Sequence, residues 1–163
     1  MAQPRVDALV ARLEKGAQRT SEAFGSLTAE QWQATVYAGP NWSVRDLLAH
    51  FVSAEEQLLA LAQYVAAGGA GAPPGFDIHA FNAKEQQRLA GRSRQELLDA
   101  LNACRRQTLV WVRTLEDSQL DRRGCHPGLG DVSLETMILA MYGHQLLHMR
   151  DLAKRLSGIS ASG

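Results

Sequence analysis

The chain has 163 residues, which is enough for one domain with its own hydrophobic core. Its 17 Lys and Arg residues balance 17 Asp and Glu residues, so the net charge is zero and we expect neither a nucleic acid nor a membrane as partner. No stretch approaches the roughly 18 apolar residues of a membrane-spanning helix, and the 2 cysteines form no CxxC motif. We therefore expect a single cytoplasmic domain over residues 1–163.

Apolar residues spaced by three and four positions dominate the first part of the chain and predict helices. One helix is expected over residues 4–25. Thr28 with Gln31 resembles a capping box, which predicts a short helical turn. Ser43, with Asp46 three positions later, predicts the start of a second long helix. The apolar stripe of this helix consists of Leu47, His50, Ala54, Leu58, Leu61 and Val65.

The middle of the chain predicts a loop followed by two helices. Segment 68–75 is rich in glycine and proline, and we expect it to be the most mobile part of the domain. Asp77 is expected to cap a shorter helix that ends near Leu89. Ser93 and Glu96 form a capping box for the third long helix. The apolar stripe of that helix consists of Leu97, Leu101, Cys104, Thr108, Trp111 and Leu115.

The last part of the chain predicts one more loop and one more long helix. The polar segment 116–131 is expected to be a loop, and Ser133 is expected to start a helix that runs to about Leu156. The small, polar tail 157–163 is expected to be disordered. No segment shows the alternation of a strand. Four long amphipathic helices joined by such loops predict an all-α protein, a four-helix bundle.

Two histidines, His144 and His148, lie four positions apart on the apolar stripe of the last helix, and therefore on one face of it. A buried neutral imidazole has two nitrogens that need partners. Hydroxyls, carbonyls or buried water can supply them, and so can a divalent metal. The pair is not the HExxH motif of zinc proteases, because Gln145 stands where the Glu would be. The stripe consists of Leu134, Met137, Met141, His144, His148 and Leu152.

A third histidine, His50, occupies a core position of the second helix. A bundle can bring one histidine and a pair together, and three histidines with an open position are typical of a catalytic metal site. The residue types therefore predict one divalent ion bound by His50, His144 and His148. Nitrogen ligands suit zinc, nickel, iron or cobalt.

The remaining histidines and cysteines are weaker candidates. We expect His126, which precedes Pro127, to be a turn residue or to lie at the rim of a pocket, and His79 to be exposed. Cys125 is a candidate for lining the same pocket as His126. Cys104, on a core stripe, is expected to be a small buried hydrophobic residue.

Four polar residues near the histidines are candidates for supporting the site. Asp46 lies one turn before His50, and Asp151 lies three residues after His148. Each of these carboxylates can instead cap a helix or pair with an arginine. Tyr142 and Gln145 flank the histidine pair, and packing against a neighbouring helix is the favoured interpretation for both. We assign no catalytic residue.

The sequence resembles the DinB-like superfamily, a group of four-helix proteins. This group includes the YfiT-type proteins and the metal-binding domain of mycothiol-dependent maleylpyruvate isomerase. The resemblance rests on residues 41–50, NWSVRDLLAH, together with residues 144–148, HQLLH, and it covers nearly the whole chain. It implies a bundle in which His50, His144 and His148 bind one divalent ion.

The resemblance also implies a function. Family members include transferases and isomerases that use a low-molecular-weight thiol, so we expect a metal-dependent enzyme that joins such a thiol to a small electrophilic substrate. Two alternatives stay open: a metal or ligand-binding protein without catalysis, and a metal-dependent hydrolase that uses a metal-bound water. The resemblance further implies a homodimer.

Overall fold

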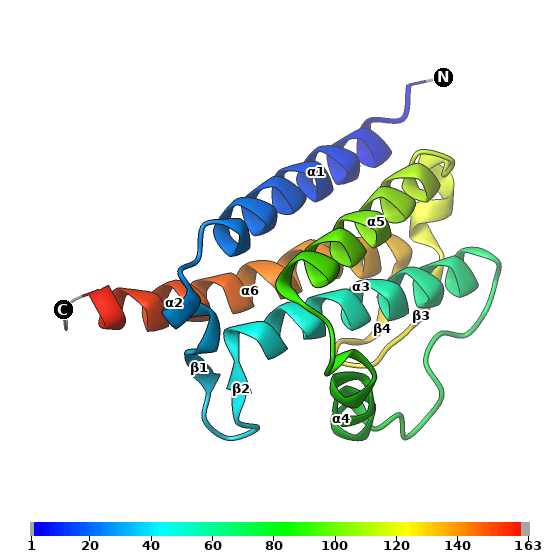
Figure 1. The fold of residues 1–163 in the computed structure, drawn as a ribbon. Helices are drawn as coiled ribbons and strands as arrows, with labels where there is room; N and C mark the ends of the chain where they lie inside the picture. The colour runs from blue at the N-terminus through cyan, green and yellow to red at the C-terminus, as the bar shows by residue number, and fades with distance from the viewer. Residues whose placement is uncertain (1, 161–163) are drawn as a thin grey trace.

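The computed structural model describes residues 2–160 and confirms the predicted all-α bundle (Figure 1). Four long helices lie side by side in it: α1 (Pro4–Gly25), α3 (Val44–Ala66), α5 (Arg94–Val112) and α6 (Leu134–Ser160). The shorter segments are α2 (Ala29–Gln33), α4 (Ile78–Leu89) and the 3₁₀ helix η1 (Asp117–Asp121). In Figure 1, α4 is seen end-on, so it crosses the direction of the long helices.

The helix starts follow the predicted capping residues. Capping boxes begin three helices, at Thr28, Ser43 and Ser93. In each, the hydroxyl of the capping residue accepts a hydrogen bond from the backbone N–H of the residue three positions later. The side chain of that later residue accepts a hydrogen bond from the backbone N–H of the capping residue in return. Asp77 accepts hydrogen bonds from two backbone N–H groups in the first turn of α4. These bonds satisfy donors that have no partner inside the helix, which is why the helices begin at these residues.

Two short hairpins were not predicted from the sequence. β1 (Thr35–Tyr37) pairs with β2 (Trp42–Ser43), and β3 (Arg123–His126) pairs with β4 (Gly130–Ser133). Both are antiparallel. Strands of two to four residues are too short to show apolar alternation, so the expectation that the chain contains no strand is wrong.

The loop 68–75, predicted to be the most mobile segment, is tied to β3. The backbone N–H of Ala72 donates to the carbonyl of Cys125 over 2.8 Å, and the N–H of Cys125 donates to the carbonyl of Ala70 over 2.9 Å. Gly71 lies between them with φ of +94°, and an added Cβ would be 2.3 Å from the nitrogen of Cys125. Only glycine therefore fits at this crossing.

The last helix is longer than expected. α6 continues to Ser160, so the expectation of disorder from residue 157 is wrong for residues 157–160, while residues 161–163 lie outside the described part. Extending an existing helix costs much less than starting one, and no proline interrupts it here.

A buried ion pair crosses the interior of the bundle. The guanidinium of Arg105 on α5 donates to both carboxylate oxygens of Glu55 on α3, over 2.6 and 2.8 Å, and to the carbonyl of Leu13 over 2.8 Å. Thr108 donates to the same carboxylate. Both charged side chains are buried, so this network fixes how α1, α3 and α5 pack.

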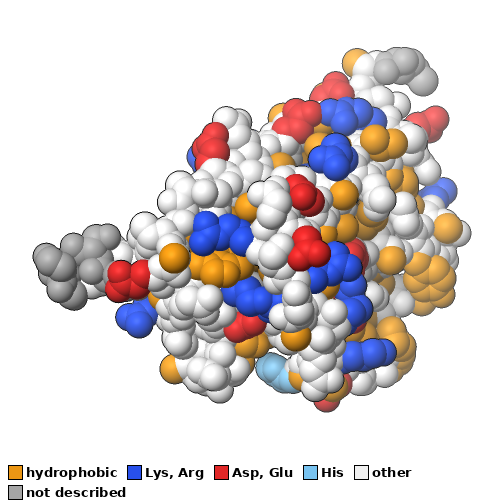
Figure 2. Space-filling view, in the orientation of Figure 1, with side chains coloured by type: hydrophobic (Ala, Val, Ile, Leu, Met, Phe, Trp, Pro, Cys, Tyr) orange, Lys and Arg blue, Asp and Glu red, His pale blue; other side chains and the backbone are white. Residues whose placement is uncertain are grey.

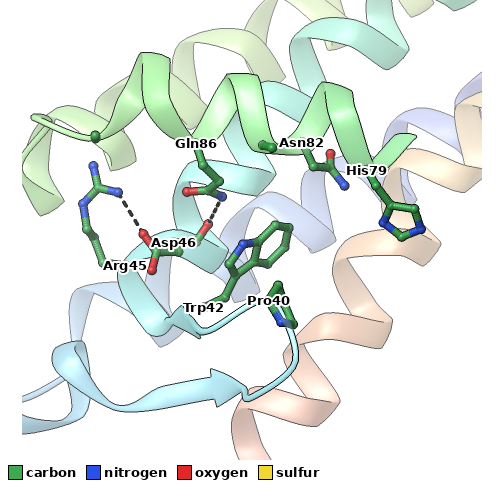
Figure 3. A pocket seen from close by; sticks show the side chains of 9 residues that line it. Pro40, Trp42, Arg45, Asp46, His79, Asn82 and Gln86 are labelled. Atoms are coloured by element: carbon green, nitrogen blue, oxygen red, sulfur yellow. Dashed lines mark hydrogen bonds and ion pairs between the residues drawn. The ribbon is translucent and has the colours of Figure 1, made fainter. Parts of the chain in front are cut away.

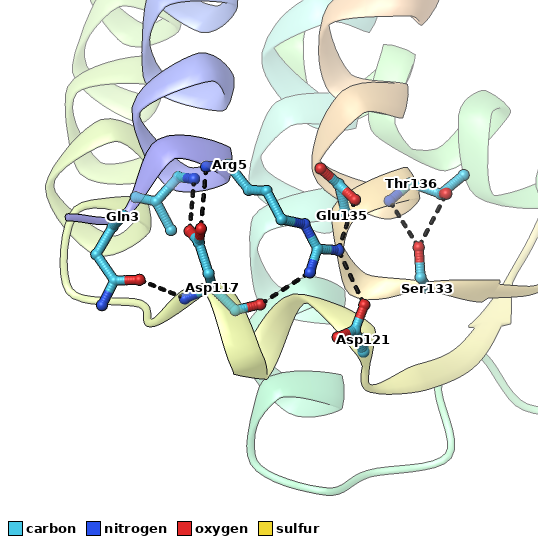
Figure 4. Close-up of polar contacts among 8 residues, drawn as sticks. Gln3, Arg5, Asp117, Asp121, Ser133, Glu135 and Thr136 are labelled. Atoms are coloured by element: carbon cyan, nitrogen blue, oxygen red, sulfur yellow. Dashed lines mark hydrogen bonds and ion pairs between the residues drawn. The ribbon is translucent and has the colours of Figure 1, made fainter. Parts of the chain in front are cut away.

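A second polar network fastens the start of α1 to η1 and to the start of α6 (Figure 4). The guanidinium of Arg5 pairs with Asp121 of η1 and Glu135 of α6, and Asp117 accepts hydrogen bonds from the backbone N–H groups of Arg5 and Val6. On the face shown in Figure 2, acidic and basic side chains are interspersed, as the zero net charge suggests. None of the helices in the described part of the chain combines the length and apolar character that a membrane span requires.

Candidate metal centre

The structure brings the three predicted histidines together. His50 lies on α3, and His144 and His148 lie one turn apart on α6. The Nε2 atom of His144 is 2.9 Å from Nε2 of His50 and 3.1 Å from Nε2 of His148. One ligand atom from each residue lies within 4.8 Å of the others. The three side chains therefore point at a common position between the two helices.

This arrangement fits a divalent metal better than hydrogen bonding among the rings. Two facing imidazole nitrogens can share one proton, so three that meet at one position cannot all be satisfied by each other. A tetrahedral ion with ligands at about 2.0–2.1 Å places neighbouring nitrogens about 3.3 Å apart. The observed spacing of 2.9 and 3.1 Å needs only a small opening to match it.

The environment keeps the three rings uncharged. Burial, followed by the proximity of His144 and His148, lowers the pKa of His50 to about 3. Burial, followed by the proximity of His148 and His126, lowers the pKa of His144 to about 4. Burial also lowers the pKa of His148. Neutral imidazole is the form that binds metal, so at neutral pH the site is ready to bind an ion.

Tyr37 on β1 holds the ring of His148. Its hydroxyl donates to Oδ2 of Asp151 over 2.7 Å and lies 2.6 Å from Nδ1 of His148. Because the phenol has one proton and gives it to the carboxylate, Nδ1 of His148 must carry a proton and donate to the phenol oxygen. This tautomer leaves Nε2 of His148 with a free lone pair. Burial, and then the bond to Asp151, raise the pKa of Tyr37, so the phenol stays protonated.

The other candidates near the triad have different roles. Asp151 supports the site through Tyr37, as one of its two interpretations predicted. Asp46 instead caps α3, accepting from the N–H and hydroxyl of Ser43. Gln145 is buried against Glu55, and Tyr142 packs against Gly16 of α1, so both residues serve packing. Tyr37 was not predicted, because its three-residue strand carries no recognisable pattern.

A cavity of about 190 Å³, here called the chamber, borders the triad. Helices α3, α4 and α6, the loop before α4 and the turn between β3 and β4 form its walls. None of the described residues that line it carries a formal charge. The lining includes His50, Leu58, Phe76, Phe81, His126 and His144. The chamber therefore offers an apolar space with two of the three histidines at its wall.

Of the remaining predicted candidates, one lines the chamber and three do not. His126 lines it, as one of its two interpretations predicted. Cys125 is absent from the described lining residues, and its backbone pairs with loop 68–75 instead. Cys104 is buried on α5 as expected, and burial raises the pKa of its thiol to about 11. His79 is exposed, as expected.

A larger hollow of about 780 Å³, here called the polar groove, lies between α4 and the start of α3 (Figure 3). In Figure 3, the side-chain amide of Gln86 on α4 donates to the backbone carbonyl of Asp46 on α3, and Arg45 pairs with the Asp46 carboxylate beside it. Asn82 lines both the groove and the chamber. Trp42, at the groove wall, packs on His50 with ring centroids 4.9 Å apart. The groove is thus the chamber's neighbour along α4.

These features define a helical-bundle protein with a three-histidine site that can hold a divalent metal ion. Residues 12–152 match the family model of the DinB superfamily. The chain belongs to this superfamily, as its sequence motifs indicated. No curated protein is similar enough to the chain to count as a match.

Two solved structures share the fold. One is YfiT from Bacillus subtilis, described as a probable metal-dependent hydrolase with an unusual four-helix bundle topology. It is 19% identical to this chain, and the two superpose with a TM-score of 0.74 over 96% of this chain and 90% of that protein. The mycothiol-dependent maleylpyruvate isomerase is 15% identical, with a TM-score of 0.73 over 90% of this chain. This chain spans 60% of the isomerase. At these identities the likeness shows the fold alone.

Proposed function

We propose that the protein is a metal-dependent enzyme. His50, His144 and His148 bind one divalent ion, zinc, nickel or iron, and a small electrophilic substrate occupies the chamber. The observation that carries this proposal is the convergence of three imidazole nitrogens beside an apolar cavity. Catalytic sites keep a position open toward a cavity, whereas structural sites are closed by protein ligands.

The chain's own residues prepare this site in three ways. Three neutral imidazoles add no negative charge, and Tyr37 with Asp151 fixes the ring of His148. The apolar walls of the chamber offer surface against which an apolar substrate can pack. When bound, a divalent ion lowers the pKa of a coordinated water or thiol and so supplies a nucleophile at neutral pH.

The nucleophile must come from outside the chain, because the described lining of the chamber contains no Ser, Thr, Cys or Lys. We propose a low-molecular-weight thiol that is transferred to the electrophile, which the mycothiol-dependent neighbour supports. Hydrolysis by water is the second candidate. It is supported by YfiT, which is described as a probable metal-dependent hydrolase and is covered over 90% of its length.

The first experiment is elemental analysis of protein purified without a nickel column. We expect about one equivalent of a divalent metal in the protein and in His79→Ala, whose exposed histidine lies outside the chamber. His50→Ala and His148→Ala should lose most of it. Full metal retention in His50→Ala would remove α3 from the site and contradict the proposal.

The second experiment separates the activities. Metal-loaded protein is given glutathione, bacillithiol or mycothiol with a panel of alkylating electrophiles, and, separately, p-nitrophenyl esters without thiol. Thiol consumption that stops on chelation and returns with metal supports the transferase. Metal-dependent ester cleavage supports the hydrolase instead. If metal binds but neither reaction occurs, the protein is better described as a binding protein.

A further inference from the structure

We propose that His126 binds the substrate directly, donating a hydrogen bond from Nε2 to an uncharged oxygen, such as a carbonyl, of a small and otherwise apolar molecule held in the chamber. The role of the chamber as a substrate site rests on the proposed function. The hydrogen bond itself does not require a metal ion.

The direction of the donor follows from the turn that carries His126. Nδ1 of His126 accepts a hydrogen bond from the backbone N–H of Gly128 over 3.1 Å. A ring whose Nδ1 accepts is neutral and carries its proton on Nε2. That Nε2 atom is buried and has no hydrogen-bond partner within the described residues. A buried donor without a partner lowers stability, so it marks a place where a ligand can supply the missing acceptor.

The hairpin holds this donor firmly in place. His126 pairs with Gly130 at the end of β3, and its neighbour Cys125 pairs with Asp131. Cys125 is also bonded through its backbone to the residues on both sides of Gly71. The backbone at His126 is therefore fixed by a strand pair, and that of its neighbour Cys125 also by a third segment crossing the strand.

The chamber decides which molecules can use this donor. Its volume of about 190 Å³ is below the roughly 300 Å³ at which pockets for drug-sized ligands begin, so it suits a small molecule. Its described lining carries no formal charge, and Phe76, Ile78 and Phe81 supply apolar surface. In the metal-free protein, a charged ligand would lose hydration there without gaining a counter-charge. His50 and His144 line the same space, so a bound carbonyl carbon would lie beside the metal site.

The test compares two probes of equal size, acetophenone and α-methylstyrene, in which a methylene group replaces the carbonyl oxygen. Dissociation constants are measured by ligand-detected NMR on the full chain, metal-free and zinc-loaded. In His126→Asn, the shorter side chain can still accept from the N–H of Gly128 but cannot reach the chamber. In His126→Gln, the side-chain amide places an N–H close to the original Nε2.

We expect His126→Asn to weaken acetophenone binding about three- to ten-fold and to change α-methylstyrene binding by less than two-fold. His126→Gln should restore most of the acetophenone affinity. An equal loss for both probes, no loss for either, or no binding of either probe to the wild type would overturn the proposal. Loss of zinc binding in His126→Asn would also overturn it, because His126 would then be a fourth ligand. Because the probes are also measured on metal-free protein, failure of the triad to bind metal leaves this test unaffected.

Discussion

The hydroxyl of Tyr37 should control how tightly the triad binds metal, although Tyr37 is not itself a ligand. Its oxygen lies 2.6 Å from Nδ1 of His148 and 2.7 Å from Oδ2 of Asp151, so Tyr37→Phe removes both bonds in a single change. The ring should stay in place, because it also packs against His148 and Trp42, with centroids 5.5 and 6.4 Å apart. The substitution therefore separates the hydrogen bonds from the packing.

We expect Tyr37→Phe to weaken zinc binding about 10- to 100-fold, the usual effect of losing a group that orients a metal-binding histidine. This corresponds to about 1.4–2.8 kcal/mol. Without the phenol oxygen, the proton on Nδ1 of His148 loses its acceptor, and the ring can change tautomer or rotate. Metal-free protein should lose about 1.5–3 kcal/mol of stability, because the lost bond to Asp151 is a hydrogen bond to a charged group.

The measurement is competition for zinc between the metal-free protein and a colorimetric chelator at neutral pH. Tyr64→Phe is the matched control, since Tyr64 is an exposed tyrosine on α3 outside the chamber lining. Zinc affinity within two-fold of wild type in Tyr37→Phe would refute the reasoning that Tyr37 positions His148. A comparable loss in Tyr64→Phe would show that the effect is not local.

Two further predictions concern the charged and titratable groups of the fold, and a third comes from the family resemblance. Acid should destabilise the metal-free protein, because the pKa values of His50 and His144 are lowered to about 3 and about 4 in the folded state. Below pH ~6.5 the unfolded chain therefore takes up more protons than the folded one. The free energy of unfolding then falls with pH, by about 1.4 kcal/mol for each unit by which a pKa is lowered. Melting temperatures of chelated protein that stay flat from pH 8 to 5 would contradict this. Glu55→Ala should lower the free energy of unfolding, measured in urea, by about 3–5 kcal/mol, because it leaves Arg105 buried without its partner. Glu14→Ala, which breaks an exposed pair with Arg113, should lower it by less than about 1 kcal/mol. We also propose a homodimer, so light scattering should give twice the chain mass of 17.8 kDa, and only the single-chain mass at high concentration would reject the dimer.

The sequence predicts the long helices and the histidine triad for the same reason. Capping residues such as Ser43 and Ser93 act within one helical turn, so the local sequence is enough to place the helix starts. His50, His144 and His148 lie on core stripes of long helices, and the packing of such stripes brings them together. Their convergence is therefore visible in the periodicity, although His50 and His144 lie 94 positions apart in the chain.

The support around the triad could not be predicted in the same way. Tyr37 reaches His148 across 111 residues from a three-residue strand, and strands this short show no periodicity. The direction of the free N–H of His126 depends on the turn of a hairpin whose strand β3 is hydrogen-bonded to the distant loop 68–75. In both cases the information lies in long-range packing, which local sequence patterns do not reveal.

The packing of Trp42 on His50 gives the site a built-in optical reporter. The chain has 3 tryptophans, and Trp42 has its ring centroid 4.9 Å from that of His50, while Trp32 lies under the guanidinium of Arg94 and Trp111 lies on α5. Quenching of indole emission by an open-shell ion falls steeply with distance. Nickel or cobalt bound at the triad should therefore quench the emission of Trp42 far more than that of Trp32 or Trp111. Zinc, which has a closed shell, should leave the emission of Trp42 unquenched.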